Sequence, residues 1–113
     1  MATTSTQQTL TVKGESGKSY TFYVHLWPTQ FTSVGGVYLF TKKYTDQNRH
    51  APLYLGITGD LSERFDNHHK MACIKKNGVT HICVLGMAGE ADREAAEKDI
   101  LATIKTTCNE MMN

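Results

Sequence analysis

Apolar and polar residues alternate in two stretches near the N-terminus, Thr9 to Val12 and Lys18 to Trp27. Alternation with a period of two is typical of a strand that buries one face. Turn-forming residues at positions 14–17 separate the two stretches, and Pro28 follows the second. Because proline cannot donate a hydrogen bond to a strand ladder, we expect a β-hairpin that ends before Pro28.

Branched and aromatic residues that suit a pleated surface recur in three later stretches, Val37 to Thr41, Leu53 to Ile57 and Thr80 to Leu85. We expect the first two to pair antiparallel. The polar segment from Lys42 to Pro52 would then be a long hairpin loop. The third stretch is expected to complete the core of the sheet.

A first helix is predicted from Asp60 to about Cys73. Asp60 is a favoured N-cap residue, and Glu63 three positions later would complete a capping box. Arg64 and His68 are four positions apart, so on such a helix they share one face.

A second helix is predicted from Glu90 to Thr106, a segment rich in strong helix formers. Leu101 and Ile104 belong to its apolar face, and Glu97 lies on the same face. A carboxylate in that position is costly unless it is paired or binds a metal ion. Two interpretations stay open for it, a metal ligand or a surface ion pair with Arg93 one turn away.

The order hairpin, strand, strand, helix, strand, helix predicts an α/β (α+β) fold in which helices pack on a sheet. The chain of 113 residues has the length of one domain. Within it we expect residues 1–33 to form a tail and a hairpin extension packed on a core of residues 34–113.

Composition limits where the protein is expected to be located and how it could bind DNA. No apolar run approaches the roughly 20 residues that span a bilayer, and the N-terminus lacks the blocks of a signal peptide. We therefore expect no membrane association and a cytoplasmic location. The three cysteines, Cys73, Cys83 and Cys108, have no metal-ligand spacing, and we expect reduced, partly buried thiols. The net charge of +1 requires any DNA-binding charge to be concentrated on one face.

Six features follow one another in a familiar order along the chain. They are Gly36-Val37-Tyr38, Tyr54-Leu55-Gly56, Arg64, His68, Glu97 and Asn109. In this order the chain resembles a GIY-YIG nuclease from about Gly35 to Asn109. It departs from the family in a longer loop between the two tripeptides and in lacking a proline before Asn109. Glu94 is the second choice for the glutamate.

The resemblance implies a fold and a set of roles. The fold would be a three-stranded antiparallel sheet flanked by helices, with the N-terminal hairpin as an addition. Tyr38 would take a proton from the attacking water, and Tyr54 would hold the water or the phosphate. Arg64 would clamp the phosphate, and His68 would contact phosphate or assist proton transfer. Glu97 would hold one divalent ion, Mg²⁺ or Mn²⁺.

The phenol of Tyr38 sets a condition on this chemistry. A free phenol has a pKa of about 10, so at pH 7 only about one in a thousand is ionised. Neighbouring positive charge is needed to favour the phenolate.

The expected substrate is DNA, with RNA left open, and self-association as a homodimer is also left open. The residues expected to contact nucleic acid are Lys42, Lys43, Arg64, His68, His69, Lys70 and Asn109. His69 is the alternative to His68 as the functional histidine. A module of the same fold that binds nucleic acid without cutting it, or that binds a protein through Tyr23 and Trp27, is the alternative function. These two aromatic residues are interpreted either as sheet packing or as a stacking surface.

Overall fold

The computed structural model describes residues 8–44, 49–63, 65 and 68–109. Within these ranges the protein has five strands and two helices, connected as β-β-β-β-α-β-α. No helix among them is long and apolar enough to cross a bilayer. The elements are β1 (Thr9–Lys13), β2 (Ser19–Leu26), β3 (Gly36–Tyr44), β4 (Arg49–Thr58), α1 (Met71–Lys76), β5 (His81–Gly86) and α2 (Glu90–Leu101).

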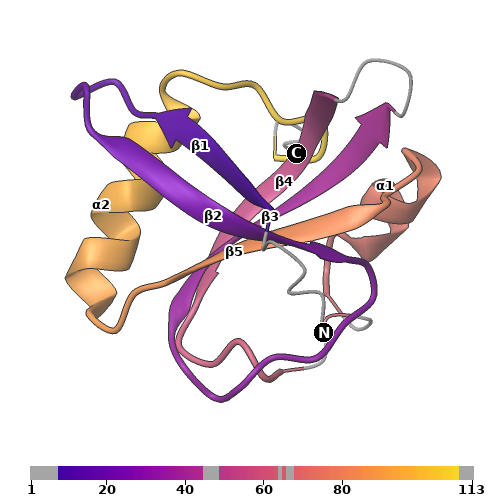
Figure 1. Ribbon diagram of the computed structural model, residues 1–113, viewed down its shortest axis with the longest axis horizontal. Coiled ribbons are helices and arrows are strands. Elements are labelled where there is room, and N and C mark those ends of the chain that lie inside the picture. The colour runs from indigo at the N-terminus through magenta and orange to yellow at the C-terminus, as the bar shows by residue number, and fades with distance from the viewer. Residues whose placement is uncertain (1–7, 45–48, 64, 66–67, 110–113) are drawn as a thin grey trace, which may run out of the picture.

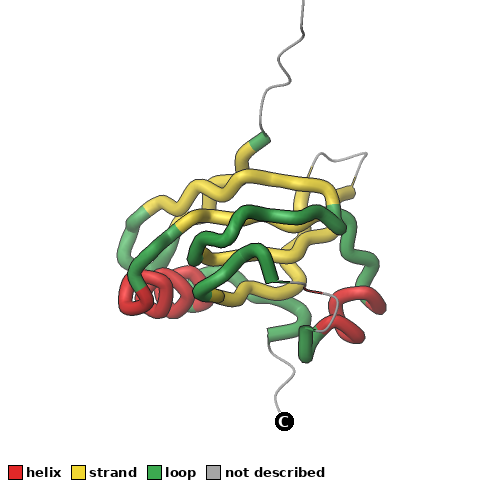
Figure 2. The backbone as a smooth tube through the Cα atoms, turned by 90° about the horizontal axis from the view of Figure 1, so that it is seen from below, coloured by secondary structure: helices red, strands yellow, loops and turns green. Residues whose placement is uncertain are grey.

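The five strands form one antiparallel sheet in the order β1-β2-β5-β3-β4. Figure 1 shows this twisted sheet passing between α2 on the left and α1 on the right, and Figure 2 shows the strands stacked in one layer. The N-terminal hairpin, β1 and β2, is part of this sheet because β2 pairs with β5. The fold is therefore α+β with a five-stranded antiparallel sheet, wider than the three strands expected.

Residues of β3 alternate between two apolar clusters on opposite faces of the sheet. Val37 and Leu39 pack with Ile100 of α2 in one cluster. Tyr38 and Phe40 pack with residues of α1 in the other. We call these the α2 face and the α1 face. The two helices thus cover opposite faces, and the rings of Tyr38 and Tyr54 belong to the α1 face.

Polar contacts tie the hairpin to the end of α2. Asp99 accepts hydrogen bonds from the backbone N–H of Ser16 (2.8 Å) and from the hydroxyl of Tyr20 (2.9 Å). Thr103 donates its hydroxyl to the carbonyl of Lys13 at 2.8 Å. These bonds join the outer hairpin to α2 and to the residues directly after it, across sequence separations of 79 to 90 residues.

The helix expected from Asp60 to Cys73 is wrong. Asp60 Oδ1 accepts hydrogen bonds from the N–H and the hydroxyl of Ser62, which makes a local turn, and Glu63 accepts from Thr58 instead of closing a capping box. The following Asp, Asn and His residues are poor helix formers. The helix begins only at Met71, as α1, and Gly78 follows its end with a φ of +82°.

Two other boundaries differ from expectation. β3 and β4 extend to Tyr44 and from Arg49, so they occupy most of the expected loop between the tripeptides. α2 ends at Leu101, before the expected Thr106, because the threonine-rich segment that follows favours side chain–backbone hydrogen bonds over a helix. The strand expected from Thr80 to Leu85 is confirmed as β5, shifted by one residue.

The prediction of three free thiols is wrong for two of them. Cys73 in α1 forms a disulfide with Cys108, near the described C-terminal end. Cys83 is free and fully buried, and burial raises the pKa of its thiol to about 12. Disulfides are typical of oxidising surroundings, whereas the location expected from the sequence is a reducing one. The cytoplasmic location stays a prediction.

Candidate active site

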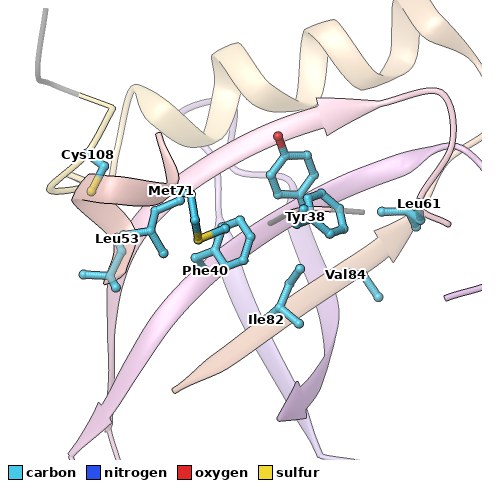
Figure 3. Packing of buried hydrophobic residues seen from close by; sticks show 10 residues of the cluster. Tyr38, Phe40, Leu53, Leu61, Met71, Ile82, Val84 and Cys108 are labelled. Atoms are coloured by element: carbon cyan, nitrogen blue, oxygen red, sulfur yellow. The ribbon is translucent and has the colours of Figure 1, made fainter. Parts of the chain in front are cut away.

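Tyr38 and Tyr54 lie near each other because the residue that faces Tyr38 on the neighbouring strand is a glycine. Tyr38 on β3 pairs with Gly56 on β4, and the two tyrosine ring centroids are 6.2 Å apart. A Cβ atom on Gly56 would lie 2.5 Å from the Tyr38 hydroxyl and 2.8 Å from Cε2 of Tyr54. Real Cβ atoms do not approach so closely, so the second tripeptide needs its glycine to admit both rings. Figure 3 shows the Tyr38 hydroxyl pointing out of the apolar cluster that holds its ring.

His68 binds the hydroxyl of Tyr38. The distance from Nε2 of His68 to the phenol oxygen is 2.8 Å, and Nδ1 accepts the backbone N–H of Lys70 at 3.0 Å. Because Nδ1 acts as an acceptor, the proton of the neutral imidazole is on Nε2. His68 therefore donates to the Tyr38 oxygen. Burial, aided by His69 and Lys70, lowers the pKa of His68 to about 4, so this neutral form persists at pH 7.

The aromatic cluster includes both histidines. The ring of Tyr54 meets His68 edge-on at 4.8 Å, and His69 stacks on His68 at 4.5 Å. His68 is half-buried, whereas His69 is exposed. We call Tyr38, Tyr54, His68 and His69 the ring cluster. Of the two histidines, His68 is the one that hydrogen-bonds the Tyr38 hydroxyl.

Glu97 of α2 acts on this cluster electrostatically. Burial raises the pKa of Tyr54, and the charge of Glu97 raises it further. Burial, then Tyr54, then Glu97 raise the pKa of Tyr38. The carboxylate itself is half-buried, and burial followed by repulsion from Glu94 raises its own pKa. Within the described residues no hydrogen bond joins Glu97 to either phenol, so the glutamate acts on the two rings through its charge alone.

The alternative partner of Glu97 is engaged elsewhere. Arg93 donates Nη1 to the carbonyls of Met87 and Ala88, at 3.0 and 2.8 Å. Within residues 8–44, 49–63, 65 and 68–109 no ion pair joins Glu97 to a cation. The carboxylate lines a shallow groove of about 910 Å³ between α2 and Ile57 of β4.

Glu97 alone could hold a hard cation that keeps most of its waters, since the groove beside it is lined largely by apolar residues and by Lys98. Among the described residues there is no group of three or more acidic, histidine or cysteine side chains that could hold a metal ion. Mg²⁺ needs only one or two carboxylates from a protein, and Mn²⁺ also prefers oxygen ligands. A single desolvated carboxylate without a paired cation fits that requirement.

Asn109 supports the strand that carries Tyr54. Its side-chain oxygen accepts the N–H of Leu55 at 2.7 Å, and its Nδ2 donates to the Leu55 carbonyl at 3.0 Å. Cys108 N–H donates to the carbonyl of Leu53 at 2.7 Å. The segment thus pairs with the outer edge of β4. The contact with nucleic acid predicted for Asn109 stays a prediction.

The other residues expected to bind nucleic acid are spread out. Lys42 and Lys43 lie four and five residues along β3 from Tyr38, and the Lys42 ammonium is 5.3 Å from the ring centroid of Tyr44. Lys70 follows the two histidines, directly before α1. Arg64 lies outside the described residues, so its predicted role as a phosphate clamp stays a prediction.

Sequence reasoning missed one residue that acts on this site. The sequence predicts only helix capping for Glu63, yet its charge also raises the pKa of Tyr38. Its spacing from Asp60 matches a capping box, and no feature of the sequence distinguishes the two roles.

A search of protein-family models, of curated proteins and of solved structures found no match. The residues and their geometry therefore carry the functional argument alone.

Proposed function

We propose that this protein is a metal-dependent endonuclease of the GIY-YIG type that hydrolyses phosphodiester bonds in DNA. The observation that carries the proposal is the association of Tyr38, Tyr54 and His68, with the Tyr38 hydroxyl 2.8 Å from His68 Nε2 and coupled to the charge of Glu97. These side chains come from β3, β4, the segment before α1 and α2. Separate segments thus supply a base, a hydrogen-bond donor and a carboxylate.

In the proposed reaction Tyr38 acts as a phenolate. It takes a proton from the water whose oxygen forms the new bond to phosphorus. The bond between phosphorus and the leaving oxygen breaks, and that oxygen takes a proton from solvent. The Nε2–H of His68 stabilises the phenolate because a hydrogen bond to an ionised acceptor is stronger than one to a neutral phenol.

Glu97 would hold the divalent ion, Mg²⁺ or Mn²⁺. When bound, such an ion neutralises the charge that develops on the phosphate oxygens and favours the phenolate nearby. Its positive charge would also offset the repulsion between the Glu97 carboxylate and the phenolate form of either tyrosine. The raised pKa of the half-buried carboxylate is consistent with a group that gains from a cation.

A second function has one observation in its favour. Burial raises the pKa of Tyr38, which is the wrong direction for a base that works at neutral pH. A module of this fold that binds DNA without cutting it, or a protein-interaction module, would not require the phenolate. Cleavage assays with divalent ions separate these functions.

The test is incubation of the protein with supercoiled plasmid, single-stranded and branched DNA in Mg²⁺ or Mn²⁺. We expect cleavage, and we expect Glu97→Gln to reduce its rate at least about 100-fold because it removes the charge that holds the ion. The matched control is Glu90→Gln, which removes the same charge from an exposed position in the first turn of α2. Equal cleavage by the two variants would contradict the proposal. DNA binding without cleavage in both ions would support the binding module.

A further inference from the structure

A second cavity is lined by Phe65, whose ring contacts that of Tyr38. It has a volume of about 520 Å³ and lies between the segment that follows β2 and the segment that precedes α1. Its lining combines aromatic, amide, acidic and basic side chains. The residues that line it are Trp27, Pro28, Thr29, Gln30, Ser62, Glu63, Phe65 and Lys75.

Phe65 is a wall shared by this cavity and the candidate active site. Its ring centroid is 4.8 Å from that of Tyr38 and 6.4 Å from that of Trp27. Glu63 also connects the two, since it lines the cavity and its charge raises the pKa of Tyr38. A molecule in the cavity would therefore lie one aromatic ring away from the proposed base.

The cavity offers stacking and hydrogen bonding together. Trp27 is half-buried and is held edge-on against Phe40, with ring centroids 5.0 Å apart. Among the described residues, Glu63 accepts one hydrogen bond, from Thr58, which leaves acceptor capacity on its carboxylate. Within the described ranges, the side chains of Gln30 and Lys75 make no hydrogen bond or ion pair. A planar heterocycle with amino and carbonyl groups matches this lining, and a phosphate attached to it would meet the ammonium of Lys75.

We propose that this cavity binds an unpaired nucleobase of the DNA strand that is cut. This proposal rests on the proposed endonuclease function and names its substrate class, which is DNA with an unpaired nucleotide beside the scissile phosphate. A base within a regular duplex is stacked on both sides and cannot enter such a cavity, whereas a bulged or single-stranded base can. The cavity would thus give the small domain a preference for structure without reading sequence.

Trp27 provides a direct measurement because it is the one tryptophan in the sequence. Three DNA ligands are compared in Ca²⁺, which binds oxygen ligands but activates water less than Mg²⁺ does. They are a duplex with one unpaired nucleotide, the same duplex with an abasic residue at that position, and the fully paired duplex. We expect the first to change Trp27 emission and to bind about 5- to 150-fold more tightly than the abasic duplex, the range for stacking one base on an aromatic side chain.

Variants then assign the effect to the cavity. Lys75→Ala and Gln30→Ala should reduce the preference for the unpaired base, while Lys76→Ala should retain it. Lys76 is exposed on the same helix and does not line the cavity, so it controls for loss of one positive charge. Trp27→Ala should abolish the preference, as measured with labelled DNA. If this loss comes from stacking and not from misfolding, Trp27→Phe should restore part of the preference.

Several results would overturn the cavity proposal. One is equal binding of the unpaired and abasic duplexes with unchanged Trp27 emission. Another is an emission change with a free mononucleotide as strong as that with DNA, which would make the cavity a small-molecule site. Failure of the nuclease function is distinguishable from either. A protein that prefers the unpaired base but cuts no DNA in Mg²⁺ or Mn²⁺ refutes the endonuclease and leaves the cavity assignment standing.

Discussion

The two faces of the sheet use the same strands for different purposes. On the α2 face the cluster is largely aliphatic, with Leu39, Leu55 and Ile100 fully buried. On the α1 face the neighbouring residues are Tyr38 and Tyr54, together with His68, all in ring contact with one another. Because successive strand residues point to opposite faces, each motif tripeptide supplies both. Val37 and Leu55 pack the core while Tyr38 and Tyr54 carry the polar groups.

Tyrosines on the two faces show the difference within one residue type. Tyr20 and Tyr38 are both buried in the sheet, with 6% and 5% of their surfaces exposed. The hydroxyl of Tyr20 donates to Asp99 and fastens the hairpin to α2. The hydroxyl of Tyr38 accepts from a neutral imidazole, so its own proton remains to be donated or lost. One hydroxyl is thus a structural donor, whereas the other accepts a hydrogen bond and, in the proposed function, would lose its proton to become the base.

The largest expected effect comes from making the same substitution on both faces. Tyr38→Phe should reduce DNA cleavage by about 10²- to 10⁴-fold, the usual contribution of a general base. Tyr20→Phe should leave cleavage by the folded protein unchanged. Each variant loses one hydrogen bond, so each should lower the free energy of unfolding by only about 1 kcal/mol. Cleavage rates and urea unfolding curves measured on both variants test the comparison. Equal cleavage by the two variants would remove the distinction between the faces.

The second effect concerns how each helix is held on its face of the sheet. The disulfide between Cys73 and Cys108 joins α1 to the segment that pairs with β4, across 35 residues. In the loop-entropy model, a bridge over that length stabilises the fold by about 4 kcal/mol. Reduction should therefore lower the free energy of unfolding by about that amount. It should also increase hydrogen exchange on the α1 face before the α2 face, where α2 packs on the sheet without a disulfide in the described ranges.

The control for reduction is the double variant Cys73→Ser/Cys108→Ser. It should match the reduced protein in stability and should not respond to reductant, because Cys83 is fully buried as a free thiol. If reductant destabilises the double variant as much as the parent protein, the effect does not come from this bridge. If it changes neither, the bridge does not stabilise the α1 face.

The strands were largely predictable from sequence, while the segment between Asp60 and Met71 was not. Alternation in β2 and branched residues in β3 and β5 fix which face each residue occupies once pairing begins. The segment after β4 has the spacing of a capping box, but Asp60 closes a turn with Ser62. The Asp, Asn and His residues that follow are poor helix formers, and Leu61 and Phe65 are instead buried in the α1-face cluster.

Several features of the candidate site had no signal in the sequence. The order of Tyr38, Tyr54 and Glu97 along the chain suggested a common site, and strand register explains why the two rings meet. Two other features depend on distances that no local pattern encodes. One is the tautomer of His68, set by the N–H of Lys70. The other is the bridge between Cys73 and Cys108, which brings together residues 35 positions apart.

The third comparison uses pH to separate the two titrating groups of the α1 face, Tyr38 and His68. Burial raises the pKa of Tyr38 above its usual value of about 10, so the phenolate fraction should rise tenfold per pH unit throughout the neutral range. Cleavage at saturating Mg²⁺ should therefore increase with a slope of about one in log rate between about pH 5 and 9. A rate that does not rise with pH between about pH 5 and 7 would show that the phenol of Tyr38 is not the base.

His68 should make the free energy of unfolding fall at acid pH, because its imidazole is neutral in the folded protein. Its pKa is about 4 in the folded protein and about 6.5 in an unfolded chain, so the unfolded chain binds more protons between these values. The free energy of unfolding should thus be constant in this respect above pH 6.5 and should fall as the pH drops toward 4. Urea unfolding of the parent and of His68→Gln, compared at pH 7 and 5, isolates this dependence because the other histidines are common to both. A parent protein that loses no more stability than His68→Gln would mean that His68 is charged in the fold, and a charged imidazole could not accept the N–H of Lys70.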